Sequence, residues 1–188
     1  MSSVSDAGVF LTEFIKNPRQ LGSIIPSSGF LKRRILRAAS LETAGTVVEL
    51  GPGNGGTTRA ILNAMPQTAR LLSIELNPGL FELGQQIDDP RYTAHHGDAS
   101  DLESILTRYN LAPPDVVISG IPFSCMDPAV ATSILQMIHR LLNADGRFVA
   151  YQVSARVDEL NTFYASERRK QEFELLNVPP LRVWRWQK

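Results

Sequence analysis

The sequence predicts an α/β fold, in which a mostly parallel sheet has helices between its strands and ends in an antiparallel hairpin. From residue 46 onward, short apolar segments alternate with helical segments of about ten residues, the pattern of right-handed βαβ units. A glycine-rich loop follows the first segment, where a strand turns into a helix. Near the end, two strand-like segments are joined by a proline-containing turn. With 188 residues, the chain has the size of one domain with a short extension.

The expected elements follow one another in a regular order. Short runs of aliphatic and β-branched residues predict parallel strands at 46–50, 71–75, 92–95, 115–119 and 147–153. The segments between them predict helices at 57–65, 79–87, 101–109 and 129–142. The hairpin strands are expected at 173–176 and 181–186, at one edge of the sheet.

The first 40 residues are interpreted as a helical extension, and residues 41–188 as the main domain. Phe10 and Phe14 lie four residues apart on an apolar stripe, which predicts an amphipathic helix over residues 6–16. Ser28 is placed to cap a second helix, whose apolar residues share one side while its bases lie elsewhere.

Charge is distributed unevenly, although the chain is neutral overall. Residues 1–40 and residues 168–188 each contain six bases and two acids, a net charge of +4, so the segment between them has a net charge of −8. If these two basic ends meet in space, they form a surface that attracts the phosphates of lipid or nucleic acid. The alternative is that these charges only keep the protein soluble.

Composition and segment length exclude several classes of protein. No apolar run approaches the ~20 residues that span a bilayer, and the N-terminus lacks the features of a secretory signal. The single Cys125 excludes an internal disulfide and a zinc site built from several cysteines. We therefore expect a cytoplasmic protein without a metal, while the sequence leaves the oligomeric state open.

The glycine-rich loop is the first candidate binding site. Its residues are Gly51, Pro52, Gly53, Asn54 and Gly55. Glycines at a strand-to-helix junction let a ligand approach the backbone, and the helix N-terminus offers free N–H groups. Glu75 ends the next strand, 20 residues after Gly55, and its carboxylate is placed to accept both hydroxyls of a ribose. These features fit either a dinucleotide or S-adenosylmethionine.

Two acidic residues favour S-adenosylmethionine over a dinucleotide. Glu49 lies inside the first strand, where a buried carboxylate needs a cationic partner. The α-ammonium of S-adenosylmethionine supplies that cation, whereas a pyrophosphate would be repelled. Asp98 follows the third strand and is placed to accept a hydrogen bond from adenine N6. The alternatives are that Glu49 pairs with a buried arginine and that Asp98 caps the next helix.

From these motifs, the chain resembles the class I S-adenosylmethionine-dependent methyltransferases over about residues 46–188. The E-x-G-x-G-x-G form, the acid at the end of the second strand, the Gly-Asp-Ala segment and the terminal hairpin occur in the family's order. The resemblance implies a Rossmann-like sheet of seven strands with an antiparallel last strand. It also implies that the cofactor contacts Glu49, Gly51, Pro52, Gly53, Gly55, Glu75, Leu76, Asp98, Ala99, Ser119 and Gly120.

The loop after the fourth strand bears on which nucleophile is methylated, since ligands bind at the carboxyl ends of parallel strands. It reads Ser119-Gly120-Ile121-Pro122-Phe123. The adenine-N6 dimethylases of ribosomal RNA have a similar loop, but they carry Asn or Asp at its first position to hold the exocyclic amine. Ser119 stands there instead, and the chain leaves no room for their additional C-terminal domain. Methylation of RNA or of a small amine is the alternative function.

Three segments resemble the membrane-associating phospholipid N-methyltransferases of bacteria. They are residues 14–28, residues 118–123 and residues 177–184, where Leu181 replaces the commoner alanine. That family methylates the amine of phosphatidylethanolamine in steps toward phosphatidylcholine. The resemblance therefore implies this activity at an anionic membrane surface, peripherally at the inner membrane. The N-terminal extension would serve as the membrane contact and the cofactor lid.

Candidate residues for binding the methyl-accepting amine are chosen by their positions in the predicted strands and segments. Trp184 and Trp186, near Arg185, are expected at the headgroup level of a membrane, with strand packing as the alternative. Tyr151 ends the fifth strand, where its hydroxyl or ring face can approach the amine, and His96 is a candidate proton acceptor. The catalytic candidates are Tyr151, His96 and Ser119. The substrate-binding candidates are Ile121, Pro122, Phe123, Lys16 and Arg182.

Overall fold

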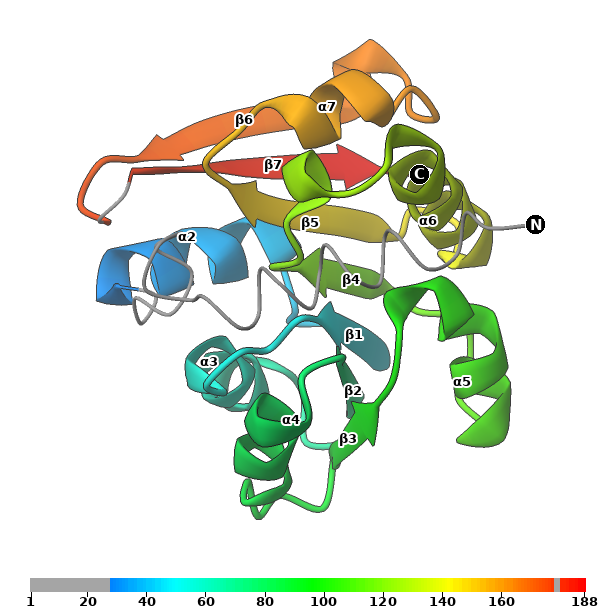
Figure 1. Cartoon of the computed structure of the whole chain (residues 1–188). Coiled ribbons are helices and arrows are strands. Elements are labelled where there is room, and N and C mark those ends of the chain that lie inside the picture. The colour runs from blue at the N-terminus through cyan, green and yellow to red at the C-terminus, as the bar shows by residue number, and fades with distance from the viewer. Residues whose placement is uncertain (1–27, 178–179) are drawn as a thin grey trace.

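The alternating segments form a seven-stranded sheet in the computed structural model, which describes residues 28–177 and 180–188 (Figure 1). The strands are β1 (Thr46–Leu50), β2 (Arg70–Glu75), β3 (Tyr92–His96), β4 (Val116–Ser119), β5 (Arg147–Gln152), β6 (Arg169–Glu174) and β7 (Leu181–Gln187). Their order across the sheet is β3-β2-β1-β4-β5-β7-β6. Strands β1 to β5 are parallel, and β7 runs antiparallel to both β5 and β6. The predicted fold class is confirmed.

The helices lie between the strands as the periodicity predicts. They are α2 (Gly29–Ala39), α3 (Gly56–Ala64), α4 (Pro78–Gln85), α5 (Leu102–Arg108), α6 (Pro128–Leu141) and α7 (Arg156–Leu160), with short 3-10 turns at Ala99–Asp101, Phe123–Cys125 and Ser166–Arg168. The expected parallel strands and the helices between them agree with the structure to within two residues at each end. The short helix α7 was not predicted, because one turn is too short to show a period.

The first hairpin strand was placed wrongly, since β6 spans Arg169–Glu174 and not 173–176. Arg169, Lys170 and Gln171 are exposed on this edge strand, so it lacks the apolar pattern by which a strand is recognised. Leu175 and Leu176, which suggested a strand, lie in the turn and are exposed to solvent.

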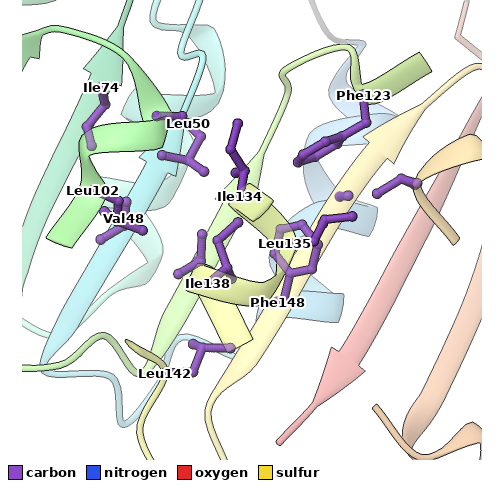
Figure 2. Packing of buried hydrophobic residues seen from close by; sticks show 14 of the residues in the cluster. Val48, Leu50, Ile74, Leu102, Phe123, Ile134, Leu135, Ile138, Leu142 and Phe148 are labelled. Carbon is purple, nitrogen blue, oxygen red and sulfur yellow. The ribbon is translucent and has the colours of Figure 1, made fainter. Parts of the chain in front are cut away.

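Apolar side chains fill both faces of the sheet. On one face, Leu31 and Ile35 of α2 and Ile61 of α3 pack against the inward-facing residues of the strands. On the other face, α5, α6 and α7 cover the sheet, and Figure 2 shows Ile134 and Ile138 of α6 among the core residues of that layer. The central strands β1 and β4 are therefore buried on both sides, as their largely apolar sequences require.

The carboxyl ends of the central strands are aligned by backbone hydrogen bonds. Gly51 N donates to Ile74 O at 2.9 Å, and Gly120 N donates to Leu50 O at 2.8 Å. Since these bonds join β1 to β2 and β4 to β1, the glycine loop and the loop after β4 lie next to each other at one edge of the sheet.

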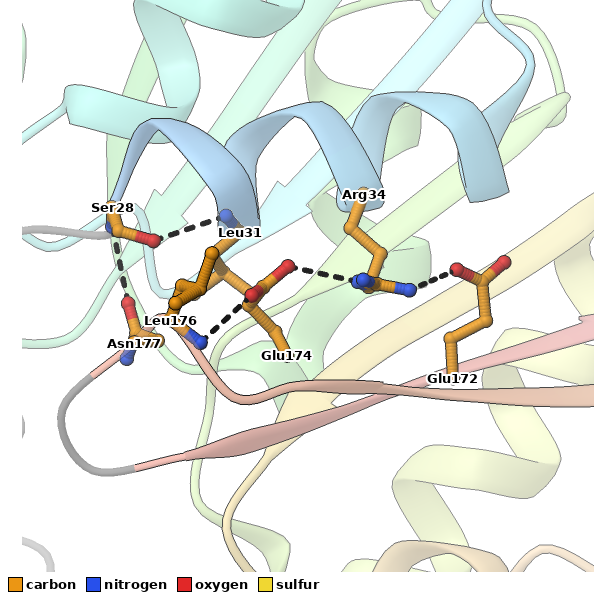
Figure 3. Close-up of polar contacts among 7 residues, drawn as sticks. All are labelled: Ser28, Leu31, Arg34, Glu172, Glu174, Leu176 and Asn177. Carbon is orange, nitrogen blue, oxygen red and sulfur yellow. Dashed lines mark hydrogen bonds and ion pairs between the residues drawn. The ribbon is translucent and has the colours of Figure 1, made fainter.

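The described parts of the two basic ends meet, because α2 packs against β5, β6 and β7. Arg34 is joined to Glu174 at 3.0 Å and to Glu172 at 2.5 Å (Figure 3). At the start of α2, Ser28 N donates to Asn177 Oδ1 at 3.1 Å, while Ser28 Oγ caps the helix as expected. The junction is therefore a set of ion pairs and hydrogen bonds in which the charge of Arg34 is balanced.

The expectation that Trp184 and Trp186 lie at a membrane headgroup level was wrong. Their exposed fractions are 3% and 1%. Both point to the α6 face of β7, where Trp186 stacks on Phe148 with ring centroids 5.2 Å apart. Strand β7 lies inside the sheet between β5 and β6, with both of its faces covered, so the strand-packing alternative is correct.

Four expectations fall partly or wholly outside the described residues. The amphipathic helix over residues 6–16 and the Lys16 contact lie there, as do residues 14–27 of the segment 14–28 and residues 178–179 of the tail segment. The division at residue 40 stays a prediction, but α2 contributes Leu31, Ile35 and Ala39 to the core shared with the sheet. Within the described residues, no helix combines the length and apolarity needed to cross a membrane.

Candidate active site

Glu49 is a fully buried acid at the carboxyl end of β1. Its Oε2 accepts hydrogen bonds from Thr58 Oγ1 at 2.6 Å and from Ser73 Oγ at 2.7 Å. Its Oε1 is buried without a hydrogen-bond partner among the described residues. No arginine pairs with it there, contrary to the structural alternative. An unpartnered buried carboxylate oxygen fits a ligand that brings its own cation.

Burial raises the pKa of the Glu49 carboxyl to about 7. The hydroxyl groups of Thr58 and Ser73 oppose this shift, and the nearby Glu75 carboxylate adds to it. The site therefore holds a carboxylate whose charge changes near neutral pH until a cation stabilises it.

The glycine loop has the backbone conformation that the motif predicts. Gly51, Gly53 and Gly55 have φ values of +71°, +58° and +76°, in the left-handed region that favours glycine. A Cβ at Gly53 would have no described atom within 4 Å, whereas one at Gly51 would lie 2.9 Å from Ile121 Cγ2. The backbone at Gly53 thus borders open space, as expected where a ligand passes.

Glu75 supports the glycine loop from the end of β2. Its Oε2 accepts a hydrogen bond from Gly53 N at 3.2 Å, and its Oε1 accepts one from Asn77 N at 2.9 Å. Glu75 is only 8% exposed. Burial raises the pKa of its carboxyl above the ordinary value, although the backbone N–H donors act in the opposite direction. The predicted ribose contact stays a prediction, but the same carboxylate also fixes the loop.

Replacing Glu75 with alanine is expected to weaken S-adenosylmethionine binding by about 1–3 kcal/mol, the range for hydrogen bonds to a charged group. Titration calorimetry measures the change. Glu82→Ala, which removes an exposed carboxylate from α4, is the matched control and should bind as the wild type does. Equal affinity in the two variants would contradict a cofactor contact at Glu75.

Asp98 and Ala99 lie after β3, on the side of the site expected to hold adenine. Asp98 Oδ1 accepts a hydrogen bond from Ser100 N at 2.8 Å, so the capping alternative is realised on the turn that begins at Ala99. Ala99 is buried. The carbonyl oxygen of Leu76, another predicted cofactor contact, lies 3.1 Å from His96 Nε2. The adenine contacts of Asp98 and Ala99 remain predictions.

His96 is not brought together with the other catalytic candidates. It is exposed at the end of β3 and stacks on Phe81, with ring centroids 5.3 Å apart. Strands β2 and β1 separate β3 from β4. Three strand spacings place His96 roughly 14 Å from Ser119 across the sheet. Its position therefore suits the adenosine side of the site and not the acceptor amine.

Ser119, Gly120 and Tyr151 do meet. Ser119 is fully buried at the end of β4, where its Oγ accepts from Ile121 N at 3.4 Å. A Cβ on Gly120 would lie 2.7 Å from Cζ of Tyr151, so the phenol ring of β5 covers the glycine. Burial raises the pKa of the Tyr151 hydroxyl above its ordinary value, and the Glu49 charge raises it further. The hydroxyl stays protonated at neutral pH and can donate a hydrogen bond.

The loop after β4 is held by a residue that the sequence did not single out. Gln152 Nε2 donates to Ile121 O at 2.6 Å, and its own Oε1 is buried without a partner among the described residues. Pro122 is half-buried beside it, while Phe123 is fully buried and meets Phe148 edge-on. The Phe123 ring therefore supports the loop from the core.

Two further residues could have been found from a sequence signal. Ser73 is a polar residue in the middle of an apolar strand, and in the sheet it stands opposite Glu49. Thr58 is the third residue of α3, the helix after the glycine loop. Both hydroxyl groups donate to the Glu49 carboxylate. The signal in the sequence was therefore a hydroxyl-bearing residue on each element expected to lie next to β1.

Arg182, the predicted phosphate ligand, lies at the same edge of the sheet. It is in register with Gln152 of β5 and with Phe173 of β6, and its guanidinium carbon lies 4.9 Å from the centre of the Phe173 ring. The placement is compatible with a substrate contact, which remains a prediction.

Comparison with known families decides the class of this site. A family described as a methyltransferase domain matches residues 47–146, more than half of the chain. The chain belongs to this family. It is a class I S-adenosylmethionine-dependent methyltransferase, and the match includes the glycine loop, Glu75, Asp98 and the loop after β4.

Curated relatives of this methyltransferase include enzymes of two kinds. It is 28% identical over 147 residues to an ornithine lipid N-methyltransferase from Singulisphaera acidiphila, and the aligned region covers 77% of each chain. It is 34% identical over 131 residues to the mitochondrial dimethyladenosine transferase 1 of Pongo abelii, covering 63% of this chain. The match spans only 36% of that relative's length.

Solved structures share the fold of the methyltransferase at low sequence identity. The O-methyltransferase TomG from Streptomyces achromogenes, in complex with SAM, has a TM-score of 0.68 at 16% identity and covers 95% of this chain and 89% of its own. The N-methyltransferase NodS from Bradyrhizobium japonicum has a TM-score of 0.67 at 13% identity, covering 84% and 93%. The cofactor is S-adenosylmethionine. The Glu49 oxygen that has no partner among the described residues, and the open face of Gly53, fit it.

Proposed function

We propose that this methyltransferase methylates the amine headgroup of phosphatidylethanolamine, stepwise toward phosphatidylcholine, at a membrane surface. The observation that carries the proposal is the similarity to a lipid N-methyltransferase over about three quarters of both chains. The name of that relative specifies ornithine lipid, another lipid with a primary amine. Both acceptors present the same nucleophile, and the three segments quoted above favour phosphatidylethanolamine.

The loop after β4 supports an acceptor other than adenine. An exocyclic amine of a base has to be held by a side-chain oxygen at the edge of the site. Ser119 is fully buried, so its hydroxyl oxygen does not lie at the surface of the loop, where a base would be held. An alkyl amine on a flexible headgroup needs less directional recognition, because it carries its own nucleophilic lone pair once deprotonated.

The residues of the site act on this reaction by positioning and by excluding water. Bound S-adenosylmethionine supplies an electrophilic methyl group, and transfer forms a C–N bond as the C–S bond breaks. A lipid amine with a pKa near that of lysine, ~10.4, must release a proton before it attacks. Tyr151 covers Gly120 and keeps its proton, so its ring and hydroxyl can orient the amine but do not remove the proton. The proton passes to water at the open edge of the site.

Vesicles of phosphatidylethanolamine and an anionic lipid, incubated with radiolabelled S-adenosylmethionine, test the proposal. We expect label in the organic phase as mono-, di- and trimethylated lipid, because each methylated amine except the last still carries a lone pair. Vesicles in which phosphatidylcholine replaces phosphatidylethanolamine serve as the control and should take up no label.

Two parallel assays identify the acceptor if it differs. Label in ornithine lipid vesicles but not in phosphatidylethanolamine vesicles would correct the headgroup and keep the lipid class. Label in ribosomal RNA, with both lipids unlabelled, would overturn the proposal in favour of the second kind of relative.

A further inference from the structure

Large apolar side chains that face solvent gather at one place on the molecule. In the described part of the chain, six are more than about a third exposed: Phe30, Leu83, Val153, Phe173, Leu175 and Leu176. Three of them follow one another around the end of the β6–β7 hairpin, where Leu175 is 72% exposed and Leu176 is 63% exposed. Only Leu83, on α4, belongs to the opposite half of the sheet.

Hydrogen bonds hold the hairpin turn and the start of α2 together. Asn177 accepts from Ser28 N, two residues before Phe30, and Glu174 joins Leu176 N to the guanidinium of Arg34 (Figure 3). The turn therefore has a fixed place beside α2, and its leucines are exposed although the backbone around them is held. Exposed leucines in a held turn do not contribute to the core, so their exposure needs another explanation.

The remaining members lie at the same end of the sheet, on both sides of it. Val153 follows the last residue of β5, Gln152, which stands opposite Arg182. Phe173 stands opposite Arg182 on its other side. We call the set Phe30, Val153, Phe173, Leu175 and Leu176 the hairpin patch.

Positive charge borders the hairpin patch directly. The guanidinium carbon of Arg33 lies 4.6 Å from the centre of the Phe30 ring, and that of Arg182 lies 4.9 Å from the Phe173 ring. The nearby acids, Glu172 and Glu174, are both engaged by Arg34. Apolar side chains flanked by guanidinium groups match the interface of a bilayer, where acyl chains lie beneath anionic headgroups.

The hairpin patch also lies at the functional edge of the sheet. Leu175, Leu176 and Val153 follow the ends of β6 and β5, at the same edge as Gly120 and Tyr151. In Figure 1 the hairpin turn and α2 lie together at the side toward which the arrowheads of β4 and β5 point. A surface in contact with the patch would bring its headgroups to the mouth of the site.

We infer that the hairpin patch docks the protein onto an anionic lipid bilayer, with Leu175 and Leu176 entering the headgroup region. The inference rests on the proposed function, which it extends by assigning the surface through which the lipid reaches the site. The experiment separates a bilayer from two other occupants, namely residues 1–27 of this chain and a second copy.

Vesicle flotation of the full chain tests the inference with the double variant Leu175→Ser/Leu176→Ser. The vesicles contain phosphatidylethanolamine and phosphatidylglycerol. Loss of two inserted leucines should lower vesicle partitioning by about tenfold or more. Leu83→Ser, which removes the 45% exposed leucine from α4, is the matched control and should float as the wild type does. Equal flotation of the double variant and the wild type would overturn the inference, as would failure of the wild type to float.

Turnover separates this inference from the proposed function. The double variant should lose activity on vesicles but keep it on a short-chain phosphatidylethanolamine dispersed as monomers, since neither leucine belongs to the site. If the double variant floats as well as the wild type and the wild type methylates the lipid, the hairpin patch is not the docking surface. The proposed function is then unaffected. A wild type that floats through the patch but methylates no lipid overturns the function and supports the docking surface.

Two measurements on the same variants identify the other occupants. If residues 1–27 cover the patch, their amide hydrogen exchange will rise in the double variant while flotation stays unchanged. If a second copy covers it, the molecular mass by light scattering will fall in the double variant with flotation again unchanged. Either result overturns the bilayer assignment.

Discussion

Glu49→Gln is expected to weaken S-adenosylmethionine binding by about 3–5 kcal/mol, on the order of a thousandfold. The substitution keeps the shape of the side chain but removes the charge that the ligand's ammonium would meet at the unpartnered Oε1. A cation left in a dry site without its counter-charge accounts for the size of the effect. Titration calorimetry at pH 8 measures it, with Glu82→Gln on the surface of α4 as the control.

The same substitution should stabilise the ligand-free protein at alkaline pH. The folded pKa of Glu49 is about 7 and the ordinary value is 4.5, so the folded state holds the proton more tightly. That contribution is complete below pH 4.5 and is lost as the pH rises to 7, which costs the wild type up to about 3 kcal/mol. Above pH 7 we expect Glu49→Gln to unfold roughly 5–10 °C higher than the wild type.

Thermal unfolding between pH 5 and pH 9 checks this expectation. The two melting temperatures should converge toward pH 5 and separate as the pH approaches 7. The affinity of the wild type for S-adenosylmethionine should fall below pH 7 by up to tenfold per pH unit, because the carboxyl must lose its proton to pair with the ammonium. A variant with wild-type affinity at pH 8 would show that Glu49 does not face the ligand's cation.

Alanine at Gly53 and at Gly120 should have opposite consequences for folding and binding. At Gly53, φ is +58° and the new methyl group meets no described atom, so the folding cost is the left-handed strain of about 1–2 kcal/mol. The methyl group projects into the space where the cofactor is expected, so binding should suffer far more than stability. Calorimetry and thermal unfolding of one preparation measure both quantities.

At Gly120, the new methyl group would lie 2.7 Å from Tyr151 Cζ and 3.0 Å from Gly51 O. Overpacking of this kind costs about 1–3 kcal/mol of stability, and displacement of the Tyr151 ring should lower kcat by about a hundredfold. The two variants therefore distinguish a methyl group that occupies the expected cofactor space, at Gly53, from one that displaces the Tyr151 ring, at Gly120. Normal cofactor affinity in Gly53→Ala, or a normal kcat in Gly120→Ala, would contradict the assignment of the loop.

The parallel part of the fold could be predicted because its strands are short and bounded by turn residues, and all of them except β3 contain a run of apolar residues. Strand β1 and the loop after it combine a continuous apolar sequence with glycines at positive φ, and both signals are local. The hairpin was less accessible to sequence reasoning. Strand β6 is exposed and polar, while the tryptophans of β7 are buried by elements far away in the sequence. Neither fact is encoded in the segment itself.

The cofactor side of the site could likewise be placed from its motif, whereas its support could not. Glu49 and Glu75 were recognised by their distance from the glycines. The hydroxyl donors Thr58 and Ser73 and the amide of Gln152 meet the site only through pairing between strands and helices. The acceptor residues depend on the ligand as well as on the fold. For this reason His96 of β3 was grouped with Tyr151 of β5, although three strands lie between β3 and β5.

Strand β7 carries both tryptophans of the chain, and this gives the molecule a built-in optical reporter. Because Trp184 and Trp186 are buried between the sheet and the helices of one face, their emission reports whether the hairpin is seated against β5. The glycine loop, at the other half of the sheet, contributes nothing to that signal. Tryptophan emission can be compared with far-ultraviolet circular dichroism during denaturation. The comparison would reveal whether the β6–β7 hairpin unfolds together with the parallel strands that carry the glycine loop or before them.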